Sequence, residues 1–212
     1  MGEARVLEER YTYGDYRSWD DDLRWELIDG EAFCMSPGPG EAHQALSAKL
    51  VTRLVTYFEG KGCRVYASPF DVMLPNGDES EDEIDTVIQP DIMILCDISK
   101  LQHNGIKGAP EVVFEILSPS TAWRDLADKL YLYERAGVKE YMTVDPVNSI
   151  VTAYRRGEDG LFSQRSVYRI SDVLEFKTFP DLKIPLNSVF ERFHITESNL
   201  ADHDTPPSRS GD

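Results

Sequence analysis

The order of apolar and polar residues predicts short strands alternating with helices. A short helix is expected over residues 13–19. The Asp29-Gly30 dipeptide between the apolar-rich segments 24–28 and 31–35 predicts a β-hairpin, because it tolerates the positive φ angles of a two-residue turn. Beyond a Pro- and Gly-rich stretch, apolar residues recur at helical spacing and predict a long helix over residues 41–59. Runs rich in β-branched residues then predict three strands, over residues 64–74, 86–96 and 111–117.

The second half of the chain repeats this alternation. A second long helix is expected after Ser118-Pro119-Ser120-Thr121, with Ser120 or Thr121 as its cap, and Gly137 suits its end. Its inner face is predicted to carry Leu126, Leu130 and Tyr133. A strand over 139–144 and a meander over 149–155 and 162–168 follow. The predicted fold class is therefore α/β (α+β), with a mixed sheet flanked by helices, in one domain over 1–200 with a flexible polar tail over 201–212.

Composition narrows the possible functions. The chain of 212 residues carries 22 Lys and Arg against 38 Asp and Glu, a formal charge of −16, which argues against a generic polyanion binder. Six of the acids lie in 76–85, where a solvated, self-repelling loop is expected. Cys34, Cys63 and Cys96 form no CxxC pair and are interpreted as core residues, which favours the cytoplasm over a secreted disulfide framework. No apolar run approaches the roughly 18 residues that span a bilayer, so no membrane association is expected.

Two acids lie inside apolar strands. Asp91 follows Pro90, and Glu115 is enclosed by Val112-Val113-Phe114 and Ile116-Leu117. A carboxylate in a buried strand is costly unless a cation, a metal or several hydrogen bonds stabilise it. If the two strands are neighbours, both acids point to one place, where two hard oxygen ligands and a main-chain carbonyl suit Mg²⁺ or Mn²⁺. The alternative is that one of the acids is a structural ion-pair partner or lies on a wet face of the sheet.

The second helix offers a cation for these acids. Asp125, Lys129 and Tyr133 are spaced to lie on one stripe, and the helix must pack back across the strand that carries Glu115. Lys129 is therefore predicted to lean toward Glu115, where it would orient a metal-bound water and stabilise charge on an attacked phosphate. The alternative is an ordinary Asp125–Lys129 surface pair.

An ordered series of motifs resembles the family of restriction-type endonucleases that is abundant in cyanobacteria and was once catalogued as a domain of unknown function. The resemblance covers roughly residues 11 to 190. It implies the αβββαβ core of the PD-(D/E)XK nuclease superfamily, here with an N-terminal hairpin and a C-terminal meander. The segments that carry it include Trp25-Glu26-Leu27-Ile28-Asp29-Gly30-Glu31, Gln89-Pro90-Asp91, Glu115-Ile116-Leu117-Ser118-Pro119-Ser120-Thr121, Asp125, Lys129, Tyr133 and Val144-Asp145-Pro146.

The resemblance also assigns site residues. It places Asp91 and Glu115 at the two acid motifs, and the metal would be bound by them and by the carbonyl of Ile116. Leu117 stands where the superfamily has the lysine of Glu-x-Lys, so Lys129 is the residue expected to take that role.

The resemblance also implies a further acid or base from the N-terminal half, where the hairpin offers Glu26 and Glu31 and the first turn of the long helix offers His43. The hairpin turn pairs Ile28 with Glu31 and Glu26 with Phe33, so only one of the two acids can face the site, and Glu31 is favoured. His43, in the first turn of the long helix, is either catalytic or a satisfied, half-buried histidine.

These inferences predict a Mg²⁺-dependent (or Mn²⁺-dependent) DNA endonuclease, with Asp91, Glu115, Lys129, Glu31 and His43 as catalytic residues. Two alternatives stay open: a nuclease-fold binding or assembly module without turnover, and a metal-dependent hydrolase of a small phosphorylated ligand. DNA binding is expected to be weak or partner-assisted, and a homo-oligomer, such as a dimer, is expected. Trp123 and Arg124 are either packing residues or contacts to a nucleic-acid backbone.

Overall fold

The computed structural model describes residues 9–35, 40–118 and 122–190. The expected polar tail 201–212 and the caps Ser120 and Thr121 lie outside these ranges. The short helix α1 (Tyr13–Tyr16) precedes the hairpin, and three 3₁₀ turns follow later in the chain: η1 (Glu81–Glu83), η2 (Ile98–Lys100) and η3 (Leu186–Ser188).

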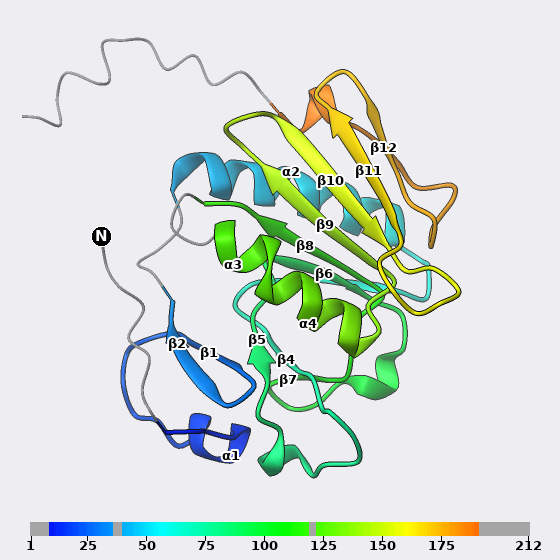
Figure 1. Ribbon diagram of the computed structural model, residues 1–212. Helices are drawn as coiled ribbons and strands as arrows, with labels where there is room; N and C mark the ends of the chain where they lie inside the picture. The colour runs from blue at the N-terminus through cyan, green and yellow to red at the C-terminus, as the bar shows by residue number, and fades with distance from the viewer. Residues whose placement is uncertain (1–8, 36–39, 119–121, 191–212) are drawn as a thin grey trace, which may run out of the picture.

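The largest sheet has six strands in the order β11-β10-β9-β8-β6-β3 (Figure 1). Its centre is β8, which runs parallel to β9 and antiparallel to β6. Helix α2 (Glu41–Phe58) precedes this sheet in the chain, and α3 and α4 connect β8 to β9. The series α2, β3, β6, β8, α3–α4, β9 is the predicted αβββαβ core, so the fold class is confirmed. The strand bounds are β3 Arg64–Ala67, β6 Ile92–Leu95, β8 Val112–Ile116, β9 Glu140–Asp145, β10 Ile150–Arg155 and β11 Gln164–Arg169.

The two faces of this sheet are covered by different helices, because side chains alternate along each strand. Leu46, Leu50 and Leu54 of α2 pack on one face, against a cluster that includes Ile92 and Phe114. The other face packs against Leu132 and Tyr133 of α4, through residues such as Met93, Val113 and Tyr141. Glu115 has the same parity as Val113, and it therefore points toward α4.

A second sheet, which the sequence does not predict as a separate unit, has the order β2-β1-β5-β4-β7. The predicted hairpin forms one side of it, with Asp29 at φ 48° and Gly30 at φ 82° in the turn. The strands expected over 64–74 and 86–96 are each divided between the two sheets. The second of them breaks at Pro90, which has no N–H to donate to a ladder. The bounds in this sheet are β1 Trp25–Ile28, β2 Glu31–Cys34, β4 Asp71–Met73, β5 Val87–Ile88 and β7 Gly105–Lys107; a separate pair follows, β12 Val173–Glu175 and β13 Lys183–Pro185.

The helix expected before Gly137 is also divided. It forms α3 (Ala122–Leu126) and α4 (Asp128–Ala136), and Gly137 ends α4 at φ 92° as predicted. The expected inner face is partly wrong: Tyr133 is buried, but Leu126 is exposed and Lys129 is buried instead. The break at Ala127, where φ is −122°, changes which residues of α3 face the sheet.

Two of the cysteines differ from expectation. All three pack against hydrophobic clusters as predicted, and Cys34 is free, but Cys63 and Cys96 form a disulfide that the sequence does not predict. Arg64 pairs with Leu95 in the antiparallel register of β3 and β6, so the residues just beyond this pair face each other. The sequence alone does not show that β3 and β6 pair in this register.

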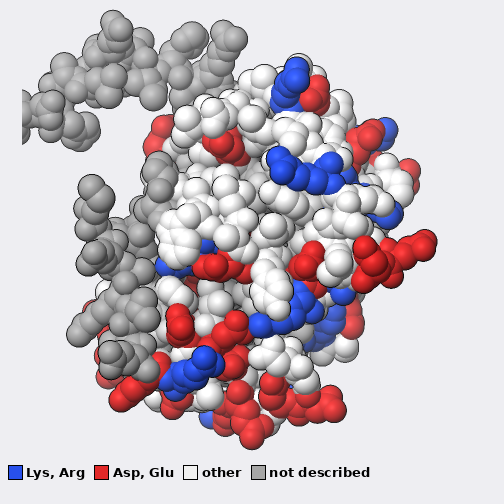
Figure 2. All heavy atoms as spheres, viewed as in Figure 1, with Lys and Arg blue, Asp and Glu red and all other residues white. Residues whose placement is uncertain are grey.

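Acidic side chains gather along the lower edge of the view in Figure 2, over α1 and the segment between β4 and β5. That segment, 76–85, is more ordered than a self-repelling loop: Arg17 pairs with Asp82 at 3.0 Å, and Lys107 Nζ donates to the carbonyl of Glu79. None of the helices in the described ranges has both the length and the hydrophobicity that spanning a bilayer requires.

Candidate active site

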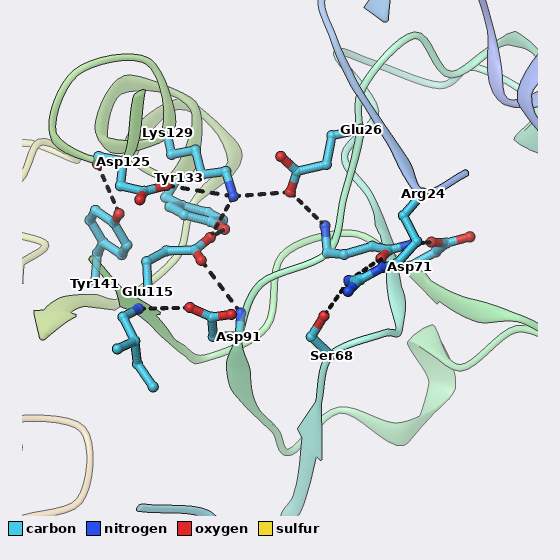
Figure 3. A network of polar contacts seen from close by, with 12 residues as sticks. Arg24, Glu26, Ser68, Asp71, Asp91, Glu115, Asp125, Lys129, Tyr133 and Tyr141 are labelled. Atoms are coloured by element: carbon cyan, nitrogen blue, oxygen red, sulfur yellow. Dashed lines mark hydrogen bonds and ion pairs between the residues drawn. The ribbon is translucent and has the colours of Figure 1, made fainter. Parts of the chain in front are cut away.

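Asp91 and Glu115 lie side by side at the point where β6 begins and β8 ends (Figure 3). Ile92 pairs with Phe114 across the two strands, so the antiparallel register places Asp91 opposite Glu115. The Asp91 N–H donates to Glu115 Oε2 over 3.4 Å, and Asp91 Oδ2 accepts a 2.7 Å bond from the N–H of Ile116. The prediction that both acids point to one place is confirmed.

Lys129 reaches this pair from α4. Its Nζ donates to Glu115 Oε1 over 3.0 Å and to Glu26 Oε1 over 2.9 Å, and it lies 3.7 Å from Asp125 Oδ1. The lysine is 4% exposed, so the Asp125–Lys129 contact is buried and is not the surface pair of the alternative interpretation. The predicted approach of Lys129 to Glu115 is confirmed.

Burial and charge act in opposite directions on these groups. Burial raises the pKa of Glu115 well above its usual value, although the Lys129 ammonium opposes that shift. Burial by itself would lower the pKa of Lys129, but Glu115, Glu26 and Asp125 together hold it well above the usual range. Lys129 is therefore a fixed cation at neutral pH, held between three carboxylates.

Two buried tyrosines complete the α4 side of the site. Tyr133 Oη donates to Glu115 Oε1 over 2.6 Å, and Tyr141 Oη donates to the carbonyl of Asp125 over 2.8 Å. Burial, followed by the nearby Glu115 carboxylate, raises the pKa of both hydroxyls well above the usual value. Both tyrosines therefore act as neutral donors that fix the acids in place.

The structure corrects the choice between Glu26 and Glu31. The pairing of Glu26 with Phe33 and of Ile28 with Glu31 is confirmed, but Glu26 is the acid that faces the site, whereas Glu31 is exposed at the start of β2. Both acids lie on one face of the hairpin, but β1 is the inner strand: it pairs with β5, which brings Glu26 Oε1 within 3.0 Å of the Gln89 N–H, whereas Glu31 lies beside the turn on the edge strand β2. A signal was available, since Glu26 lies between apolar Trp25 and Leu27, as Asp91 and Glu115 lie in apolar strands.

The role of Gln89, two residues before Asp91, is not apparent from the sequence. Its buried amide is fully bonded: Oε1 accepts from Arg24, at 2.7 Å from Nη2, and Nε2 donates to Asp71 Oδ1 over 2.8 Å and to Tyr16 Oη over 3.2 Å. Arg24 Nη2 also donates to Ser68 Oγ over 2.6 Å. This network fixes the segment Gln89-Pro90-Asp91 and hence the position of Asp91.

His43 is brought to the site by the first turn of α2. Its Nε2 lies 3.0 Å from Asp91 Oδ2, and its Nδ1 is buried without a partner among the described residues. Both sequence-based interpretations fit this placement, because a half-buried histidine can also orient the carboxylate that it touches.

The acids fit a hard divalent cation better than zinc. Among the described residues, no three His, Cys, Asp or Glu side chains gather as a metal site would require. Two carboxylates with water and main-chain oxygen suit Mg²⁺ or Mn²⁺, whereas a structural zinc site requires four protein ligands. The carbonyl of Ile116 is the main-chain ligand expected from the sequence. The contact that the structure shows between Ile116 and Asp91 is made by the N–H of Ile116.

Comparison with known proteins identifies the family. A family model described as "Putative restriction endonuclease", Uma2, matches residues 13–187. The chain belongs to the Uma2 family. It is 26% identical, over 167 residues, to an uncharacterized protein of Synechocystis, and the match covers 77% of this chain and 83% of that protein.

The fold of the Uma2 chain is also found in a solved structure. The crystal structure of a putative nuclease of the DUF820 family from Anabaena variabilis superposes with a TM-score of 0.66 at 18% identity. The superposition covers 84% of this chain and 97% of the other. This likeness supports the fold. The roles of individual residues are inferred from the geometry of the site.

Proposed function

We propose that this protein is a Mg²⁺-dependent (or Mn²⁺-dependent) endonuclease that hydrolyses DNA phosphodiester bonds. The observation that carries the proposal is the buried contact of Lys129 with Glu115, directly beside Asp91. Two acids on adjacent strands and a lysine that reaches them are the groups that metal-assisted phosphodiester hydrolysis needs. Membership of the Uma2 family supports the same activity.

Each residue has a distinct role in this proposal. Asp91 and Glu115 hold the metal together with main-chain oxygen at Ile116, and the bound metal supplies a Lewis acid and a more acidic water. The Lys129 ammonium orients the attacking water and stabilises the negative charge that develops on the phosphate. His43 orients Asp91 through their 3.0 Å contact.

Substrate binding and cellular context form part of the proposal. The charge of −16 implies weak DNA binding, which the metal or a partner protein strengthens. We also propose that the protein acts in the cytoplasm, where DNA is available, although the Cys63–Cys96 disulfide removes the argument from the cysteines for that compartment. We further propose that it forms a homodimer through the strands after residue 145. Gel filtration at several concentrations tests the dimer.

Cleavage assays test the site. Purified wild-type protein, Asp91→Ala, Glu115→Ala and Lys129→Met are incubated with supercoiled plasmid and with single-stranded circular DNA, in Mg²⁺, Mn²⁺ or EDTA. We expect cleavage in either metal, loss of cleavage in both acid variants, and a loss of about 10²- to 10³-fold in Lys129→Met. Glu31→Ala, an exposed acid on the same hairpin, is the matched control and keeps wild-type activity.

Two results would favour other functions. Calorimetry that detects no Mn²⁺ or Mg²⁺ binding, together with absent cleavage, would indicate a binding or assembly module. Hydrolysis of nucleotides in a substrate panel without cleavage of DNA would indicate a hydrolase of small phosphorylated ligands. Unchanged cleavage in Asp91→Ala and Glu115→Ala would refute the proposed site.

A further inference from the structure

Arg124, on α3, differs from the other buried charged side chains. It is 7% exposed, yet it makes no hydrogen bond or ion pair with the described residues, and its Nε is buried without a partner there. The remaining buried charges in the described ranges all have partners. Lys129 pairs with Glu26, Glu115 and Asp125. Arg155 pairs with Glu140, and Glu111 accepts a hydrogen bond from the Cys96 N–H. A buried cation without an anion is costly, so its retention calls for a ligand.

Aromatic rings hold the Arg124 guanidinium in place. It lies over the ring of buried Phe33, 4.3 Å from the centroid, and 5.4 Å from the ring centroid of Trp123. Ring contacts stabilise the positive charge and fix the plane of the group, but they leave its N–H donors in that plane unused. A planar donor set with a fixed orientation is suited to two phosphate oxygens.

The hairpin places Arg124 next to the acids and Lys129. Glu26 and Phe33 are paired across β1 and β2, so their side chains share one face of the hairpin. On that face Glu26 contacts Lys129, and Phe33 lies under Arg124. The residue after Arg124 is Asp125, which also contacts Lys129.

We propose that Arg124 binds a backbone phosphate of the nucleic acid, next to the phosphodiester that is hydrolysed at Asp91 and Glu115. This inference rests on the proposed function and identifies how an acidic protein holds a polyanion. Trp123, 59% exposed beside the guanidinium, provides a face on which a base of the same strand stacks.

Binding measurements test the proposal. Fluorescence anisotropy with labelled single-stranded and duplex oligonucleotides, in Ca²⁺, compares wild type with Arg124→Met, which keeps an unbranched apolar stem over Phe33. We expect Kd to rise about tenfold and the slope of log Kd against log salt to fall by about one, as for the loss of one phosphate contact. The control is Arg169→Met, which removes the same charge from the exposed strand β11 and leaves Kd within about twofold.

Thermal unfolding separates binding from a structural role. Because Arg124 makes no hydrogen bond or ion pair with the described residues, and Met keeps an apolar contact with Phe33, Arg124→Met is expected to keep or raise the melting temperature. Arg155→Met, which breaks the 3.0 Å pair with Glu140, should lower it. A lower melting temperature in Arg124→Met, or wild-type DNA affinity in that variant, would overturn the proposal. Stabilisation by inorganic phosphate through Arg124, without oligonucleotide binding, would also overturn it.

The outcomes distinguish this inference from the proposed function. If oligonucleotide binding depends on Arg124 but no DNA is cleaved in Mg²⁺ or Mn²⁺, the inference holds and the endonuclease proposal fails. If DNA is cleaved with dependence on Asp91 and Glu115, and Arg124→Met has wild-type KM and kcat, the endonuclease proposal holds and the inference fails.

Discussion

At the scale of single residues, the site depends on three carboxylates around one ammonium group. Glu26 is 2% exposed, and its Oε1 accepts from both Lys129 Nζ and the Gln89 N–H. Glu26→Gln keeps the shape of the side chain but removes the charge from a buried, charge-assisted hydrogen bond. We expect the free energy of unfolding in urea to fall by about 1.5–3 kcal/mol, and cleavage of plasmid to fall with it, because Lys129 loses one of its anchors.

Glu31→Gln is the matched control for this change, on the same hairpin and with the same substitution. Glu31 is exposed, so its variant should stay within about 0.5 kcal/mol of wild type. Equal losses in the two variants would mean that Glu26 does not make the buried contact with Lys129.

The residue scale also shows what the sequence could and could not predict about the site. Asp91 and Glu115 were predictable, because a charge within an apolar run needs a partner, and the spacing along the second helix pointed to Lys129. The hairpin register puts Glu26 and Glu31 on the same face, because residues 26, 28, 31 and 33 share it, and it does not show which of the two strands lies nearer to α4. That choice depends on the pairing of β1 with β5, a contact between segments distant in sequence.

At the scale of elements, the fold depends on strands that change from one sheet to the other. The sequence predicts one strand over residues 64–74 and another over 86–96, because the pattern of apolar residues continues across the points where the structure divides each of them. The crossing points are fixed by tertiary contacts, such as the bond from the Ser68 N–H to the Asp91 carbonyl, which a local pattern does not encode. Helix α2, whose pattern is long and periodic, was predicted to within one residue at its end.

The network at the second of these crossings predicts a pH dependence. Burial raises the pKa of Asp71, against the hydrogen bonds from Gln89 and Tyr16 that lower it. A raised pKa means that the folded state binds the proton more readily than the unfolded chain, so stability is lost as pH rises from the unfolded pKa through the folded one. Asp71→Asn imitates the protonated acid, and its Oδ1 can still accept from both partners.

Melting temperatures measured from pH 3 upward check this prediction. The difference between Asp71→Asn and wild type should be constant below the unfolded pKa of about 3.9 and should grow in favour of the variant as pH rises. Exposed Asp22→Asn is the control, and its difference should show no such rise. A constant difference for Asp71→Asn across the whole range would contradict the direction assigned to this pKa.

At the scale of the whole molecule, the uneven charge bears on how the DNA of the proposed reaction would approach. The acids gather most densely over α1 and the segment between β4 and β5, whereas acidic and basic side chains are interspersed in the upper part of the view in Figure 2. A net charge of −16 repels a polyanion through a field that salt screens, whereas a direct contact is screened much less. A salt titration of DNA affinity should therefore distinguish the effect of the net charge, which salt screens, from the effect of the proposed Arg124–phosphate contact.

The triple variant Asp20→Asn, Asp22→Asn, Asp78→Asn makes this separation measurable. All three acids are exposed, and the structure shows no side-chain hydrogen bond or ion pair for them within the described residues, so folding stability should change little. We expect oligonucleotide binding to tighten severalfold at about 0.05 M salt and to match wild type near 0.5 M, where the Debye length is only a few ångströms. A gain that persists at high salt would instead mean that these acids meet the DNA directly, and the binding face would then have to include the hairpin and α1.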